Sequence, residues 1–154
     1  MQDYGKSLFD RINNSACLIV CIAAERLQAL IRGSDEAAGE FGIYAGYLMN
    51  YRATLGKTVP VVFTITKADK LAEGEFSKGV EILKNEIFSQ FFQPGYTEDW
   101  FMMFVGVCLG EFQDSNDGLI YGEFRPTNIH LPVLFAVRCA LLEKMQASQG
   151  TLDS

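Results

Sequence analysis

The chain has 154 residues, of which 49% are hydrophobic and 21% are charged, and its formal net charge at pH 7 is −6. This length and hydrophobic share are typical of one globular domain with its own core. An acidic balance disfavours nucleic acid or a membrane as the main partner, because phosphates and anionic lipids repel it. We therefore expect a single domain over 1–154 that ends in a polar tail at 147–154.

The first strongly apolar stretch is ACLIVCIAA, which begins at Ala16. It is about half as long as a membrane-spanning helix and lacks the basic leader of a signal peptide. Its continuous apolar character predicts a buried parallel strand over 16–22 that is covered on both faces. The preceding SLFDRINN, 7–14, has the pattern of a short amphipathic helix.

The four cysteines do not form a recognisable site. Cys17 and Cys21 lie about 13 Å apart if they share a strand, which is too far for a disulfide. Cys108 and Cys139 are distant in sequence, and no zinc-ligand spacing is present. We expect four reduced thiols, no metal site and a cytoplasmic protein.

A long helix is expected to follow a loop and to start at Ser34. The Ser34 hydroxyl can cap it, and Asp35 and Glu36 favour a helix N-terminus. Apolar residues then recur at helical spacing at Phe41, Tyr44, Leu48 and Met49. The same segment contains Gly39, Gly42 and Gly46, which cost about 1 kcal/mol each relative to alanine. Tight packing on a sheet would explain these glycines.

The second half of the chain predicts further alternation of strands and helices. VPVVFTI, 59–65, and WFMMFVGV, 100–107, have the composition of buried strands. Between them an apolar helical stripe is formed by Phe76, Val80, Leu83, Ile87 and Phe91. Asp117-Gly118 then favours a hairpin turn.

A closing helix is expected in PVLFAVRCALLEKM, 132–145, with Pro132 in its first turn. Its inward-facing residues are predicted to be Val133, Val137, Ala140 and Leu141. The alternation as a whole predicts an α/β protein, with a parallel sheet and flanking helices in three layers. Ligands of such sheets bind beyond the carboxyl ends of the strands, where TKAD, 66–69, and CLGE, 108–111, are expected to form loops.

The two loops carry a family resemblance. TKAD, after VVFTI and before a helix, resembles the [N/T]-K-x-D guanine-specificity motif of P-loop GTPases. VGVCLG, 105–110, resembles their final base-contacting loop, and FRPTNIHLPVLFAV, 124–137, is similar to the entry to the last helix in some large prokaryotic GTPase-like domains. The resemblance extends from ACLIVCI to the closing helix and implies a partial P-loop GTPase-like fold.

The resemblance also implies roles for five residues. Asp69 would accept hydrogen bonds from the ring N–H and exocyclic amine of guanine. The aliphatic part of Lys67 would lie over the purine, and Thr66 takes the place of the more usual asparagine that rigidifies the loop. Cys108 and Leu109 occupy the positions of a serine-alanine pair whose backbone N–H groups approach the guanine carbonyl oxygen.

The phosphate-binding half of such a site is missing. No G-x-x-x-x-G-K-[S/T] loop follows the first strand. TLGKT, 54–58, has Tyr51 where the first glycine is needed, and it precedes a strand. We therefore expect GTP or GDP to bind only conditionally, Mg²⁺ to bind only with the missing half, and the chain alone not to hydrolyse GTP.

Three interpretations remain open. The chain is the guanine-recognition half of a longer GTPase-like regulatory domain, so that its partners are a guanine nucleotide and either another protein or the remainder of a longer chain. Alternatively it is a degenerate scaffold that acts as a protein interaction module, or Lys67 and Asp69 only solvate a strand end. A small-molecule enzyme is disfavoured because no nucleophile or acid–base pair is evident; His130 is the single histidine and suits a loop or capping role.

Overall fold

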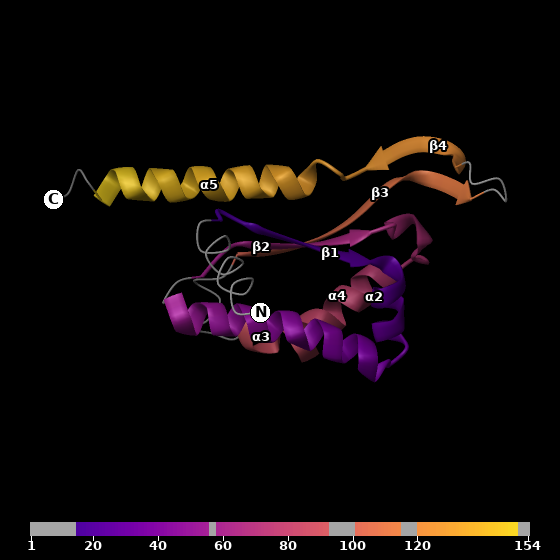
Figure 1. The fold of residues 1–154 in the computed structure, drawn as a ribbon, viewed down its shortest axis with the longest axis horizontal. Helices are drawn as coiled ribbons and strands as arrows, with labels where there is room; N and C mark the ends of the chain where they lie inside the picture. The colour runs from indigo at the N-terminus through magenta and orange to yellow at the C-terminus, as the bar shows by residue number, and fades with distance from the viewer. Residues whose placement is uncertain (1–14, 56–57, 93–100, 115–119, 151–154) are drawn as a thin grey trace, which may run out of the picture.

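The structure is a computed structural model that describes residues 15–55, 58–92, 101–114 and 120–150. These residues form a four-stranded sheet in the order β1–β2–β3–β4, with helices on both faces (Figure 1). The strands are β1 Leu18–Ala23, β2 Val61–Thr66, β3 Met102–Asp114 and β4 Ile120–Thr127. The α/β class is confirmed, but the sheet is mixed instead of wholly parallel.

The first three strands form the parallel part of the sheet. Leu18 of β1 is in register with Val61 of β2, which is in register with Met102 of β3. β2 is the central strand of this part, and Val61, Val62, Phe63 and Ile65 are fully buried. The apolar run VVFTI therefore forms the covered strand that its sequence predicts.

The first strand is less covered than expected. Ile22 is buried, but Ile19 is 46% exposed and Cys21 is also exposed. β1 lies at the edge of the sheet, and no described strand pairs with its outer side. The prediction of a strand covered on both faces is therefore wrong for β1 and correct for β2.

Three helices lie on one face of the sheet: α2 Ala24–Ile31, α3 Asp35–Leu55 and α4 Glu75–Ile82 (Figure 1). α2 replaces the loop expected after β1, and it buries Ala24, Leu27 and Leu30. The Ser34 cap is confirmed, since the Ala37 N–H donates to the Ser34 hydroxyl oxygen at 3.3 Å. α4 continues into a π-helical turn, Leu83–Ile87, and a 3₁₀ turn, Ser89–Phe92, which together include the predicted apolar stripe.

The glycines of α3 do not pack against the sheet. A Cβ added at Gly39, Gly42 or Gly46 would have no neighbouring atom within 4 Å. The close contact is made by Gly79 of α4, where an added Cβ would lie 2.6 Å from Cγ of Leu27 on α2. The expected glycine-mediated packing therefore joins two helices and involves a different glycine.

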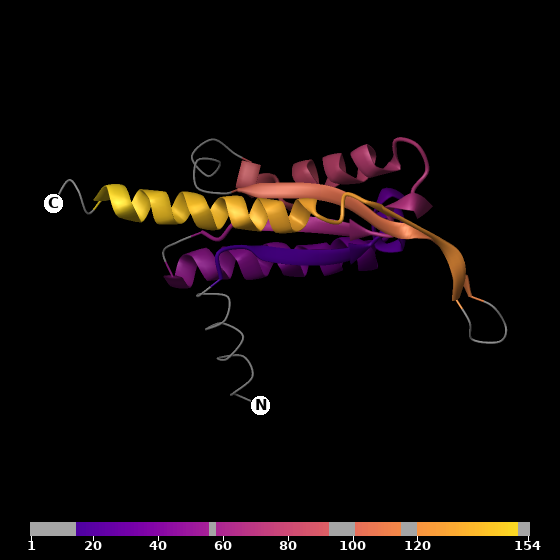
Figure 2. The same ribbon diagram turned by 90° about the horizontal axis from the view of Figure 1, so that it is seen from above.

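The closing helix, α5 Leu131–Gly150, runs along the opposite face of the sheet (Figures 1 and 2). Pro132 lies in its first turn as predicted, and the helix extends into the expected polar tail. The predicted inward face is wrong for Val133, Val137 and Leu141, which are 50% to 57% exposed, and correct for Ala140. The covered side instead carries Pro132, Phe135, Ala136, Cys139 and Ala140. Apolar residues surround most of this helix, so their spacing alone does not define which side is buried.

The hairpin prediction is confirmed by the antiparallel pairing of β3 with β4. Its turn at Asp117-Gly118, the predicted helix over 7–14 and the end of the tail at 151–154 lie outside the described residues. Within the described ranges, no helix is both long and apolar enough to cross a membrane. All four cysteines are free.

Candidate functional site

The chain turns sharply where β2 ends. Thr66 is the last residue of the strand, and Lys67 adopts a left-handed conformation with φ 56° and ψ 40°. The next residues, Ala68–Lys70, form a single 3₁₀ turn, closed by a 3.0 Å bond from the Lys70 N–H to the Lys67 carbonyl. A left-handed conformation is uncommon for a residue with a side chain and costs roughly 1 kcal/mol. This turn places Asp69 beyond the carboxyl end of the central strand.

Asp69 lines two adjoining cavities between this turn and the β3–β4 pair, which we call the β2–β3 crevice. The larger cavity has a volume of about 440 Å³ and is lined by Ala68, Asp69, Phe76, Gly106, Cys108, Thr127 and Asn128. The smaller has a volume of about 210 Å³ and is lined by Asp69, Cys108, Gly110, Glu123, Arg125 and Thr127. No described residue forms a hydrogen bond or ion pair with the Asp69 carboxylate. The crevice therefore contains an acceptor that is available to a ligand.

Gly106 and Asn128 fix the wall of the crevice. A Cβ at Gly106 would lie 3.0 Å from Cβ of Ala68, so the absence of a side chain lets β3 approach the turn closely. Asn128 has a positive φ of 58°, and its Nδ2 donates to the Gly106 carbonyl at 3.2 Å. This bond connects the end of β4 to β3 beside Asp69.

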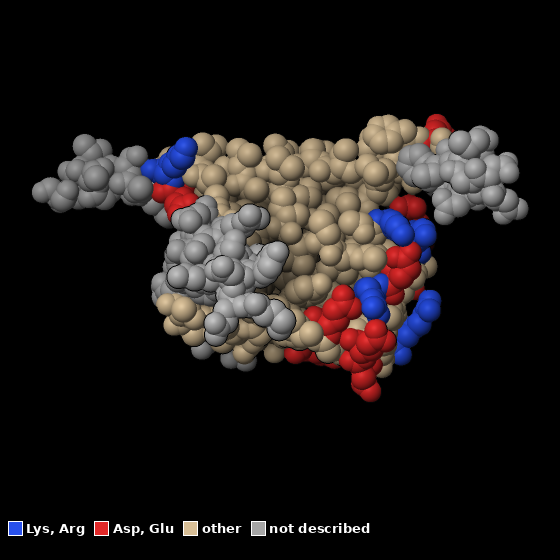
Figure 3. All heavy atoms as spheres, in the orientation of Figure 1, with Lys and Arg blue, Asp and Glu red and all other residues tan. Residues whose placement is uncertain are grey.

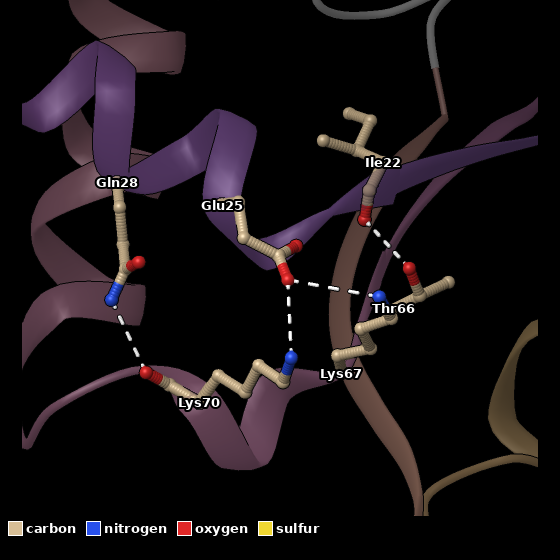
Figure 4. A network of polar contacts seen from close by, with 6 residues as sticks. All are labelled: Ile22, Glu25, Gln28, Thr66, Lys67 and Lys70. Atoms are coloured by element: carbon tan, nitrogen blue, oxygen red, sulfur yellow. Dashed lines mark hydrogen bonds and ion pairs between the residues drawn. The ribbon is translucent and has the colours of Figure 1, made fainter. Parts of the chain in front are cut away.

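A polar network ties the same turn to β1 and α2 on its other side (Figure 4). The Thr66 hydroxyl donates to the Ile22 carbonyl at 3.2 Å. Glu25 at the start of α2 pairs with Lys70 at 3.3 Å and with Lys67 at 3.7 Å. The Lys67 ammonium therefore lies on the β1–α2 side of the turn.

Glu75, the first residue of α4, anchors the end of the turn. Its carboxylate accepts hydrogen bonds from Gln28 Nε2 at 2.8 Å and from the Ala72 N–H at 2.9 Å. These bonds, with that from Gln28 the larger effect, lower the pKa of Glu75 from its ordinary value. The pKa of Glu25 is also lowered, first by its own backbone N–H at the start of α2 and then by Lys70. Both carboxylates are thus ionised at neutral pH and hold the turn in place.

The five residues implied by the GTPase resemblance are not all in one place. Asp69 and Cys108 line the crevice together. Thr66 and Lys67 are engaged with β1 and α2, and the Leu109 side chain is 54% exposed and lines neither cavity.

The segment around Cys108 is not the loop that its sequence suggests. β3 continues through it to Asp114, and Cys108 pairs with Thr127 of β4. The register shifts between Cys108 and Gly110, where Leu109 of β3 lies opposite two residues of β4, Arg125 and Pro126, so the extra residue is on β4 and Leu109 has no single ladder partner. Gly110 has φ 128°, and an added Cβ would collide with the Glu123 carbonyl.

Sequence reasoning did not identify the residues that β4 contributes to the crevice. Thr127 is the last residue of β4 and Asn128 follows it, and Arg125 lines the smaller cavity with its ion-pair partner Glu123, 2.8 Å away. Asn128 belongs to the TNIH stretch before α5, which carried only a weak turn signal. Their proximity to Asp69 depends on the register with which β4 returns along β3, and the Asp117-Gly118 turn signal predicts the return but not the register shift near Gly110.

No protein-family model, curated protein or solved structure matches this chain. Among the described residues, no group of three or more His, Cys, Asp or Glu side chains is arranged to hold a metal ion.

Proposed function

We propose that the protein binds the base of a guanine nucleotide in the β2–β3 crevice, as the base-recognition half of a GTPase-like regulatory domain. The observation that supports this most is the Asp69 carboxylate, which follows the buried central strand, lines the crevice and has no described partner. A carboxylate accepts two hydrogen bonds from the ring N–H and exocyclic amine of guanine. Adenine has no such pair of donors, so it would leave the acceptor unpaired.

The surroundings of Asp69 suit a flat heterocycle. A volume of about 440 Å³ lies within the usual range of small-molecule sites, roughly 300–1,000 Å³. Phe76, Ala68 and Gly106 provide an apolar wall. Together these features offer a suitable volume, an apolar surface and a hydrogen-bond acceptor.

Lys67 would have to leave Glu25 to cover a bound base. Both side chains of this pair are about half exposed, and their separation is 3.7 Å. Exposed ion pairs contribute about 0–1 kcal/mol, so a bound purine can compete for the aliphatic part of Lys67 at low cost. The observed position of Lys67 is therefore compatible with its proposed role.

Phosphate binding would require a second component. The sequence contains no phosphate-binding loop, and phosphoryl transfer depends on positioning and charge neutralisation of the phosphates. A protein partner or the remainder of a longer chain would supply these groups and the Mg²⁺ site. Tight binding of GTP or GDP belongs to that complex, and the chain alone would recognise only the base.

Nucleosides test this proposal directly because they need no phosphate site. In amide NMR titrations, guanosine should shift the signals of Ala68–Lys70 and of Gly106–Leu109, and adenosine should not. Asp69→Asn should weaken guanosine binding at least tenfold and improve binding of xanthosine, whose second carbonyl matches the asparagine amide. The matched control is Glu73→Gln, which removes an exposed acid of the same loop that lines neither cavity. Equal shifts with both nucleosides, or shifts unchanged by Asp69→Asn, would refute the proposal.

One observation favours the alternative of a protein interaction module. Large apolar side chains are exposed on α5, and an exposed apolar surface of this kind is typical of a protein interaction site. Such a module would give no specific shifts with guanosine, so the same titration separates the two functions.

A further inference from the structure

The helix α5 has two apolar sides and only one of them is covered. The side with Pro132, Phe135 and Cys139 lies against the sheet. The opposite side carries large apolar residues, Val133, Leu134, Val137, Leu141 and Met145, and Leu142 lies at its border, where it also lines a cavity with Cys139; all six are 42% to 62% exposed. A helix that is apolar all round is normally buried all round. The apolar side chains on the outer side of α5 are therefore expected to be buried against another protein surface.

This outer side continues onto the edge of the sheet. Ile19 of β1 is 46% exposed, and α5 runs over the other strands and leaves β1 to one side (Figure 2). We call the six exposed α5 residues and Ile19 the α5–β1 face.

No acidic residue lies between Leu131 and Leu142 of α5, although the protein is acidic. Figure 3 shows acidic and basic side chains where α2 and α4 lie, over β4 and near the C-terminal end of α5, and none along the rest of α5 on the side turned to the viewer. Arg138 is the only charged residue between Leu131 and Leu142; it is exposed and lies on the same side of the helix as Leu134 and Leu141. A second molecule with the same net charge can therefore approach this face without bringing acidic groups together.

The exposed apolar area is large enough for a stable interface. Each of the seven side chains exposes on the order of 100 Å², which gives roughly 650 Å² in total. A standard interface covers about 800 Å² per partner, of which about 60% is apolar, so it needs about 500 Å². The α5–β1 face exceeds this amount without any contribution from other surfaces.

We infer that the α5–β1 face is the interface of a homodimer. Two-fold pairing is the commonest form of self-association, and it requires one surface to complement itself. Leu134, Val137, Leu141 and Met145 recur at spacings of three and four and form a ridge along the helix. An antiparallel pair of such ridges brings Leu141 of each copy near the centre and excludes water from both. This inference is independent of the nucleotide proposal, because the crevice lies at the carboxyl end of the strands.

The test is the mass of the full chain in solution, measured by sedimentation equilibrium over a range of concentrations. The wild type should weigh twice the 17.1 kDa of one chain. Leu141→Glu places a charge at the centre of the face and should raise the dissociation constant at least a hundredfold. The matched control is Ile43→Glu on α3, because Ile43 and Leu141 are both 57% exposed; this variant should remain dimeric.

A second variant excludes misfolding as the cause. The double substitution Leu134→Ala and Leu141→Ala removes apolar area without adding charge and keeps good helix formers. It should retain the wild-type far-ultraviolet circular dichroism and raise the dissociation constant at least tenfold. The inference is overturned if the wild type is a monomer up to about 100 μM, a concentration well above usual homodimer dissociation constants. It is also overturned if the Leu141→Glu and Ile43→Glu variants dissociate to the same extent, or if the face proves to be covered by another part of the chain or bound only by a different protein.

Discussion

Replacing Gly79 by alanine should destabilise the protein, although alanine is the better helix former. In an open helix position this change stabilises by about 1 kcal/mol. At Gly79 the new Cβ would lie 2.6 Å from Cγ of Leu27, whereas carbon atoms normally pack about 3.5–4.0 Å apart. Leu27 is completely buried and cannot move into solvent. Overpacking of this kind costs about 1–3 kcal/mol, so the net effect is a loss of up to about 2 kcal/mol.

The matched control is Gly39→Ala in α3, where the added methyl group meets nothing within 4 Å. That variant should gain about 0.5–1 kcal/mol, so the two substitutions should differ by about 2 kcal/mol and have opposite signs. Urea unfolding followed by circular dichroism measures both, and the thermal midpoint should fall by several degrees only for Gly79→Ala. If Gly79→Ala stabilised the protein as much as Gly39→Ala, the close contact between α4 at Gly79 and α2 at Leu27 would be refuted.

A double-mutant cycle then identifies the cause. Leu27→Ala alone should cost about 2–5 kcal/mol, because it removes a fully buried side chain. In the Gly79→Ala background the same change should cost at least about 1 kcal/mol less, since it also relieves the overlap. Additive effects would show that the methyl group added by Gly79→Ala does not contact Leu27.

Two further predictions concern titration. Burial, reinforced by Cys139, raises the pKa of the Cys17 thiol to about 11. At about pH 8 the exposed Cys21 should therefore be alkylated at least about tenfold faster than Cys17, as measured by mass spectrometry of the digested protein. Equal alkylation rates of the two cysteines would contradict the packing of Cys17. The pKa of Glu75 is lowered by its hydrogen bonds from Gln28 and the Ala72 N–H, so its stabilising contribution is complete above its unfolded pKa and is lost as the pH falls through its lower folded pKa. Glu75→Gln should therefore unfold with a shallower pH dependence in the acid range below about pH 4.5, and identical acid unfolding curves for variant and wild type would count against this anchor.

The sequence predicted the elements whose patterns are unambiguous. VVFTI has no polar interruption apart from one threonine, and it forms the buried central strand. The cap of α3 by the Ser34 hydroxyl was predictable, because a serine followed by two acidic residues is a local signal for a helix N-terminus. The helix α2 was missed because Ala24 follows β1 directly, without a break in composition. The covered side of α5 could not be predicted, because both of its sides are apolar.

The candidate site was predictable only in part, for a related reason. Asp69 is identified by its position just after the strand, which is a local feature, and it does line the crevice. The other wall comes from Thr127 and Asn128, which reach it through the β3–β4 pairing and the register shift at Gly110. The hairpin itself was predicted, but the irregular register that brings Thr127 and Asn128 to the crevice has no signal in the neighbouring residues.

The strand β3 is long enough to belong both to the parallel sheet and to the β3–β4 hairpin. Its first half, Met102–Val107, lies in the parallel sheet, and its second half, from Cys108 onward, forms the hairpin with β4 that projects past the helices (Figure 1). A single continuous backbone thus forms both the crevice wall and the start of the projecting hairpin, since Cys108 and Gly110 line the crevice and also lie in the part of β3 that pairs with β4. A molecule bound to the hairpin would therefore contact the same strand that carries the wall next to Asp69.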